Sequence, residues 1–205
     1  MRPTDVLMAE HRVIEQVLGC LQAIVNQACS GGGLDVNDAR DTIAFFRTFA
    51  DRCHHAKEEN HLFPALARKG LSPDSGPVAV MLEEHEMGRT SIGDMADALD
   101  GYLSSRPGAA AVFAQAAREY IELLNQHIGK EDGILFPMAG NMLNPHEQSV
   151  VLAGFEKAEE EDLGAGTHEK FLAIADRLGK KYSVKRRSEA SASSFGCCGH
   201  HHHHH

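Results

Sequence analysis

Two stretches of this chain nearly repeat each other: HHAKEENHLFP at residues 54–64 and HIGKEDGILFP at residues 127–137. They have His, Lys, Glu, an acidic residue, Leu, Phe and Pro at matching positions. A nearly equal shift in numbering relates LMAEH at residues 7–11 to MLEEH at residues 81–85. The chain therefore contains a duplicated unit, in which a single His precedes a His-x-x-x-Glu motif.

The duplicated polar residues lie on helical stripes that are otherwise apolar. The first stripe runs from Leu7 to Ala28 with alternating spacings of four and three residues, and it includes His11. This spacing is typical of a helix with one buried face. A titratable residue on such a face is costly unless something compensates it. Residues i and i+4 differ by about 40° of rotation and about 6 Å of rise, so the His and Glu of each motif point the same way.

These residues form a ligand set for two metal ions. We predict that two histidines hold each ion and that two glutamates bridge the ions. This leaves an oxo, hydroxo or water bridge and one open position for a small molecule. Imidazole and carboxylate without thiolate suit iron, manganese or zinc. We expect two iron ions (Fe2+/Fe3+), because two redox-capable ions can pass two electrons to a bound diatomic. The predicted metal ligands are His11, His54, Glu58, His85, His127 and Glu131.

Other polar residues near the motifs are alternative ligands. His55 and Glu59 repeat the spacing one residue on, but the second copy has Ile128 and Asp132 there. We therefore expect His55 and Glu59 at the surface or beside the ligands. Asp132 is a weaker candidate than Glu131, because an offset of five residues turns it about 100° further round the helix. Carboxylates that could accept a hydrogen bond from a ligand histidine are Glu10, Glu83, Glu84 and Glu86.

Four further residues stay outside the predicted ligand set. His61 corresponds to Ile134 in the second copy, and His146 is expected to face water. Tyr120 lies on the stripe of His127 and is interpreted as a core residue, with a hydrogen bond to a bound ligand as the alternative. His168, with Glu160 nearby, is interpreted as a capping or solvent-facing residue; the alternative is an extra ligand over an open end of the bundle.

The pattern of apolar stripes predicts an all-α fold. A second helix starts after Asp35 and stops at Gly70, a third starts near Pro77, and a fourth follows Gly108. Short loops favour an up-down-up-down antiparallel four-helix bundle over residues 1–141. Pro64 and Pro137 should kink or close their helices. Residues 142–181 are predicted to form a C-terminal helical extension, with helices starting at Asn144-Pro145 and Thr167.

The remaining segment, residues 182–205, is predicted to be a disordered tail, because it has almost no apolar content. Its last six histidines are interpreted as a purification tag. Cys197 and Cys198 in this tail have no assigned role; an incidental position is favoured over a metal or redox site.

Composition restricts the class of protein. The net charge of -9 argues against a nucleic-acid or anionic-membrane binder, since either needs a concentrated basic face. No stretch of about twenty apolar residues and no signal-peptide pattern is present. The five cysteines are odd in number and irregularly spaced, which fits a reducing compartment. We therefore expect a cytoplasmic protein.

At its repeated motifs, the chain resembles the hemerythrin-like (HHE cation-binding) family, non-haem di-iron four-helix bundles. The resemblance covers about residues 1–140 and includes the Leu-Phe-Pro sequences ending at Pro64 and Pro137. In the oxygen-carrying members, a fifth histidine follows the third-helix histidine by four residues; here that position is Arg89. This departure argues against simple reversible oxygen carriage. With four histidines and two glutamates, the chain instead resembles members of the family that act in repair of iron centres, in nitric oxide or peroxide reduction, or in sensing.

The resemblance implies a di-iron protein that binds and reduces nitric oxide, dioxygen or hydrogen peroxide in stress defence. Its partners would be that small ligand and an electron donor that the sequence does not identify. The alternative is a non-catalytic module for iron or oxygen binding, storage or sensing, which would signal through the C-terminal extension. A zinc-stabilised scaffold is a third interpretation.

Overall fold

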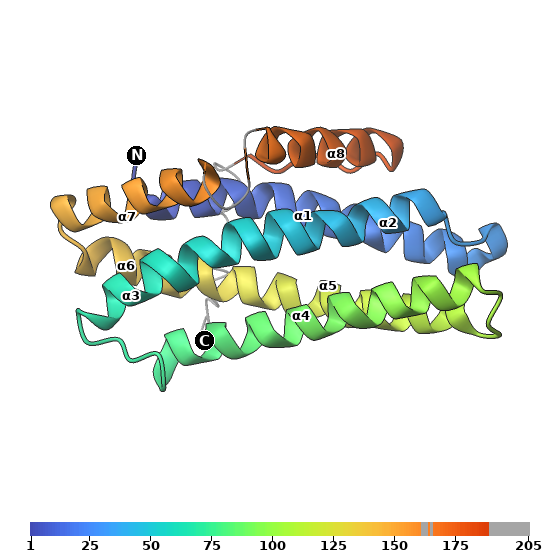
Figure 1. Cartoon of the computed structure of the whole chain (residues 1–205), viewed down its shortest axis with the longest axis horizontal. Coiled ribbons are helices and arrows are strands. Elements are labelled where there is room, and N and C mark those ends of the chain that lie inside the picture. Colours follow the sequence, from blue (N-terminus) through green and yellow to red (C-terminus); the bar gives the residue numbers. More distant parts are fainter. Residues whose placement is uncertain (161–163, 165, 189–205) are drawn as a thin grey trace, which may run out of the picture.

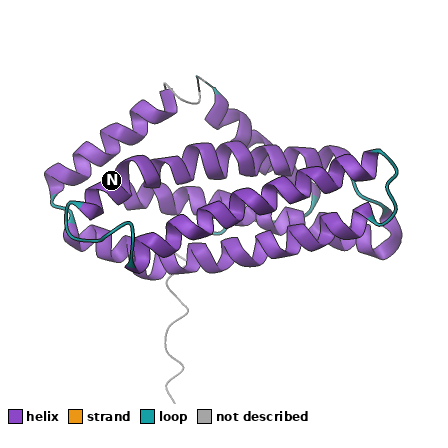
Figure 2. Ribbon diagram, turned by 60° about the horizontal axis from the view of Figure 1, so that its bottom comes forward, coloured by secondary structure: helices purple, strands orange, loops and turns teal. Residues whose placement is uncertain are grey.

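The computed structural model of the chain describes residues 1–160, 164 and 166–188. The regular structure of this part is helical, and it contains no strand, as the sequence predicted (Figure 1, Figure 2). Long helices lie side by side, and α7 and α8 lie outside them, along α1 (Figure 1). None of the helices in the described residues is both long enough and apolar enough to cross a membrane. The bundle helices are α1 (Pro3–Gln27), α2 (Val36–Phe45), α3 (Phe63–Ala67), α4 (Gly76–Leu103), α5 (Ala109–Lys130) and α6 (Phe136–Met142), followed by α7 (Pro145–Ala158) and α8 (Thr167–Lys181).

Short polar motifs set the ends of several helices. Gly31 and Gly33, both with positive φ, end the first helical segment, because glycine adopts this conformation without steric cost. The Asp35 side chain accepts a hydrogen bond from the Asp38 backbone N–H and caps α2. Asn144 forms a reciprocal cap with Glu147 at the start of α7. The predicted starts of α2, α7 and α8 are confirmed.

Wider π-helical turns interrupt the helices that carry the repeated motifs. The path from α2 to α3 contains η2 (Phe46–His55) and η3 (Glu58–Leu62), and η4 (Glu131–Leu135) joins α5 to α6. In both copies the turn closes with a bond from a Phe N–H to the carbonyl of the motif glutamate five residues earlier. Pro64 and Pro137 follow directly; they lack an N–H and cannot restore the α-helical bond at once. A short π-helical segment is typical of functional sites.

The apolar core consists of two clusters with a polar layer between them. The larger cluster includes Ile14, Phe46 and Leu124, and the smaller one includes Leu7 and Phe136. The repeated histidines and glutamates come between these residues in the sequence and are themselves buried. At about 25 cal/mol per Å² of buried apolar surface, these clusters stabilise the bundle and hold the polar layer inside it.

The C-terminal extension packs on α1 and α2. Asp38, which is 2% exposed, accepts hydrogen bonds from Arg177 and Tyr182. It also forms an ion pair with Lys181. Beyond α8, the Val184 carbonyl accepts a hydrogen bond from the Gln16 side chain. The predicted disordered tail lies largely outside the described residues, as do Cys197 and Cys198.

Candidate metal centre

The six predicted ligands all lie in one buried polar layer. Each has a relative exposure of 2% or less. They come from α1, the α2–α3 path, α4, and α5 with η4, so each long segment of the bundle contributes. Side-chain atoms from His11, His54, Glu58 and Glu131 lie within 4.8 Å of one another. A second group, within the same limit, contains Glu58, His85 and His127 together with His55.

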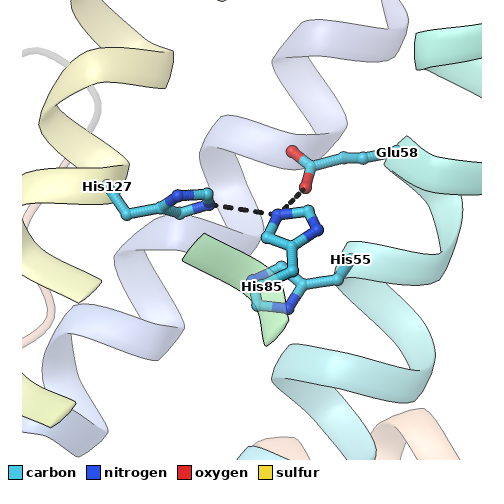
Figure 3. Close-up of side chains that lie close together, drawn as sticks. All are labelled: His55, Glu58, His85 and His127. Carbon is cyan, nitrogen blue, oxygen red and sulfur yellow. Dashed lines mark hydrogen bonds and ion pairs between the residues drawn. The ribbon is translucent and has the colours of Figure 1, made fainter. Parts of the chain in front are cut away.

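The two glutamates connect these groups. Glu131 Oε2 lies 3.1 Å from His11 Nε2 and 3.3 Å from His127 Nε2. Glu58 places Oε1 3.6 Å from His54 Nε2 and Oε2 3.4 Å from His85 Nε2. Each carboxylate therefore spans the two groups, as expected for bridging ligands. Figure 3 shows Glu58 and His127 pointing toward the His85 ring from opposite sides.

His55 also lies in this layer: of the two expected places, at the surface or beside the ligands, the structure shows the second. Its side chain is 4% exposed, and its ring stacks on His85 with centroids 3.8 Å apart (Figure 3). Both ring nitrogens lack a hydrogen-bond partner in the described structure. The cause is η2, in which the Ala56 N–H bonds to the Asp51 carbonyl five residues back. A wider turn changes the angle between successive residues, so the α-helical spacing rule does not hold there.

Carboxylates orient the four duplicated histidines from outside. Glu10 lies 2.9 Å from His54 Nδ1, and Glu84 lies 2.9 Å from His127 Nδ1. Both were predicted for this role, whereas Glu83 and Glu86 are exposed. Since each Nδ1–H donates to a carboxylate, the Nε2 lone pair faces the centre. The other two pairs are His11 with Asp132 and His85 with Glu59, each at 2.7 Å.

Each of these outer carboxylates also contacts a cationic side chain. Lys57 pairs with Glu10, and its counterpart in the repeat, Lys130, pairs with Glu84. Because both repeated motifs have a lysine at this position, the repeat itself is a signal for this pairing. That pairing is not among the predictions made from the sequence. The remaining pairs are Arg12 with Asp132 and Arg89 with Glu59.

A cation fits the inner face of the layer. His11 Nε2, His54 Nε2 and both carboxylate oxygens of Glu58 and Glu131 are buried without a hydrogen-bond partner among the described residues. His85 Nε2 and His127 Nε2 face each other at 3.2 Å. If both Nδ1 atoms carry protons, two lone pairs meet there, and such atoms are costly to bury. Metal ions bound in the two groups would pair with all of these atoms.

The electrostatics of the two glutamates agree with this fit. Burial, and then the charge of Glu131, raise the pKa of Glu58 well above its usual range. Burial also acts to raise the pKa of Glu131, but His127 and His11 outweigh it and the pKa falls. In turn, burial acts to lower the pKa of His127, and Glu131 and Glu84 overcome it, raising the pKa to about 9. Without a cation, the two buried carboxylates cannot both remain charged at low cost.

The other candidates lie outside the inner layer. His146 is exposed, and the His61 ring lies 6.1 Å from the Phe155 ring. Tyr120 is a core residue, 1% exposed, and its ring contacts Phe46. His168 is half-buried and forms a third group with Glu10 and Glu159. The ammonium of Lys57 already contacts both of those carboxylates, so we assign no metal there.

Comparison with known proteins agrees with this geometry. The chain is similar to uncharacterised proteins of Mycobacterium bovis (strain ATCC BAA-935 / AF2122/97) and Mycobacterium tuberculosis (strains CDC 1551 / Oshkosh and ATCC 25618 / H37Rv). Each is 24% identical over 184 residues, which is 86% of this chain and 67% of the relative. No solved structure matches it. The sequence profile of the hemerythrin HHE cation-binding domain matches residues 2–139. With its buried His and Glu clusters in that region, the chain belongs to the hemerythrin HHE cation-binding family, whose members bind metal.

Proposed function

We propose that the chain holds two iron ions in this layer, within an up-down-up-down bundle, and that it binds and reduces a small oxidant in stress defence. The observation that supports this most is the sharing of Glu58 and Glu131 between two adjacent buried groups of imidazoles. Imidazole and carboxylate ligands suit iron. Two iron ions so held would supply two electrons to a pair of nitric oxide molecules, to one dioxygen or to one hydrogen peroxide.

The two ions would be bound by different numbers of histidines. One ion would be held by His11 and His54, and the other by His55, His85 and His127. The two glutamates would contact both ions. The ion with two imidazoles would have fewer protein ligands and therefore more room for an outside molecule. The two apolar clusters on either side keep bulk water from the layer, which strengthens its electrostatic interactions.

Rapid mixing tests this proposal. The protein, freed of its terminal histidines, is loaded with Fe2+ without oxygen and analysed for metal. It is then mixed separately with nitric oxide, dioxygen and hydrogen peroxide in the presence of a reductant. We expect repeated turnover with at least one oxidant. Binding of one equivalent without turnover would contradict an enzyme, and a preparation that retains zinc and rejects iron would contradict the iron centre.

The alternative is a non-catalytic module that stores or senses iron or oxygen. One observation favours it: α7 and α8 pack beside the layer, on the side of Glu10. Stoichiometric binding in the mixing experiment, together with a metal-dependent change in the extension, would support this alternative.

A further inference from the structure

The surroundings of the His54 Nδ1 atom differ from those of the same atom in its counterpart, His127. On both sides a Glu accepts from the ring Nδ1, and a Lys pairs with that Glu. Lys130 has a side-chain exposure of 38%, so water can satisfy its remaining N–H groups. Lys57 has a side-chain exposure of 1% and depends on protein partners.

Helix α7 supplies the missing partner of Lys57. The Lys57 ammonium contacts the carboxylate of Glu159, the residue that follows α7, and lies 5.8 Å from the centre of the Phe155 ring. A buried ammonium is costly unless it is paired and hydrogen-bonded. Glu159 therefore helps to keep Lys57 in the position from which it contacts Glu10.

A chain of direct contacts consequently leads from the extension to a metal ligand: Glu159 to Lys57, Lys57 to Glu10, and Glu10 to His54 Nδ1. His168 of α8 lies 4.0 Å from the same Glu10 carboxylate. The family match ends at residue 139, so this contact comes from a part of the chain outside the matched domain. In the second repeat no comparable element buries the lysine among the described residues, since the Lys130 side chain remains partly exposed.

We infer that Glu159 is a positioning residue for His54, and that it couples the ion bound by His11 and His54 to the docking of α7. This inference rests on the proposed two-metal centre. Coupling is reciprocal: if Glu159 strengthens the binding of that ion, then loading of the ion strengthens the docking of α7. The ion held by His55, His85 and His127 has no such contact with α7 and would feel its docking only through the shared Glu58 and Glu131.

The test compares Glu159→Gln with Glu156→Gln. Both remove one charge near the end of α7, but Glu156 is exposed and takes no part in the contacts described. Fe2+ binding is titrated without oxygen against a competing chelator. Loss of the carboxylate that hydrogen-bonds to a metal-binding histidine typically weakens metal binding about 10- to 100-fold. For the more distant Glu159, we expect one of two binding steps to weaken roughly 3- to 10-fold, with a clearly smaller change in the other.

A second measurement separates positioning from general support of the fold. Backbone hydrogen exchange of residues 145–158 is followed with and without Fe2+. We expect Fe2+ to slow exchange in the unmodified protein and in Glu156→Gln, and to have little effect in Glu159→Gln. Equal weakening of both steps, or α7 exchange that ignores Fe2+ in the unmodified protein, would overturn the inference. If the unmodified protein does not bind two ions, the proposed function itself fails.

Discussion

At the scale of single residues, His55 makes the two halves of the duplicated unit different. Its counterpart in the second copy is Ile128, which is buried in the larger apolar cluster. His55 has no hydrogen-bond partner in the described structure, and burial, together with the neighbouring His85, lowers its pKa well below the usual range. A neutral imidazole with a free lone pair is the form that binds metal.

His55→Ile tests the role of this residue by giving both copies the same side chain. We expect the ion near His85 and His127 to bind at least 10-fold more weakly, because removing a ligand should cost no less than removing an outer partner. The other ion should be retained. Chelator competition with Fe2+ measures both steps. His146→Asn, at an exposed histidine, is the control, and equal titrations for the two variants would show that His55 is not a ligand.

The repeated motifs allowed much of this layer to be predicted from the sequence. The six predicted ligands share a spacing of four residues or a place on an apolar stripe, and helical geometry alone brings such residues to one face. His55 could not be found in this way, because the α-helical spacing rule assumes turns that η2 does not have. Arg12 and Arg89 were also beyond sequence reasoning, since their partners come from distant elements.

At the scale of elements, a buried carboxylate anchors α8. Burial acts to raise the pKa of Asp38, but Lys181, Tyr182 and Arg177 outweigh it and lower the pKa. A carboxylate with a depressed pKa stabilises the folded state above its unfolded pKa, and this contribution is lost as the pH falls through the folded value. The anchoring should therefore be complete at neutral pH and weaken in acid.

We accordingly expect residues 167–181 to become more accessible as the pH falls below the ordinary range of an aspartate. Hydrogen exchange of α8, corrected for the intrinsic pH dependence, measures this. Asp38→Asn should expose α8 already at neutral pH, since it removes the charged acceptor shared by Arg177, Lys181 and Tyr182. Because both cations are nearly half exposed, the expected loss is about 1–3 kcal/mol. Asp41→Asn, at a side chain that is 42% exposed, should have little effect. Similar exchange in the two variants would contradict the anchoring role.

The ends of the elements were easier to predict than their interiors. Asp35, Asn144 and the glycines after α1 act through local geometry, so their effect is visible in the sequence. The π-helical turns η3 and η4 end just before Pro64 and Pro137, and this proline signal can be read from the chain. The turn η2 contains no proline, so the sequence carries no such signal for it. The packing of α7 and α8 depends on contacts between distant residues, such as Lys57 with Glu159.

At the scale of the whole molecule, the buried polar layer lowers the stability of the metal-free bundle. A bound cation would link the helices that contribute to it and so raise the stability. Four segments of the bundle each place at least one unpaired or like-charged group in this layer. The metal-free protein must bury these groups at a cost, whereas ions bound as proposed would join the segments. Stability should therefore depend strongly on metal.

Removal of metal should lower the thermal midpoint of the bundle. At Fe2+ concentrations of about 100 to 1,000 times the dissociation constant, binding to the folded state alone adds roughly 3–4 kcal/mol per site. Calorimetry before chelation, after chelation and after return of Fe2+ under nitrogen measures this. The terminal histidines should be removed first. A midpoint that does not change in protein shown by elemental analysis to have lost its metal would contradict a structural contribution from the ions.

Cys53, next to His54, is 3% exposed, and burial followed by the charge of Glu10 raises the pKa of its thiol to about 12. Sulfur reacts with peroxides as the thiolate. A protonated, enclosed thiol beside this layer should therefore resist conversion to a sulfenic acid, even if a peroxide reaches the neighbouring histidines.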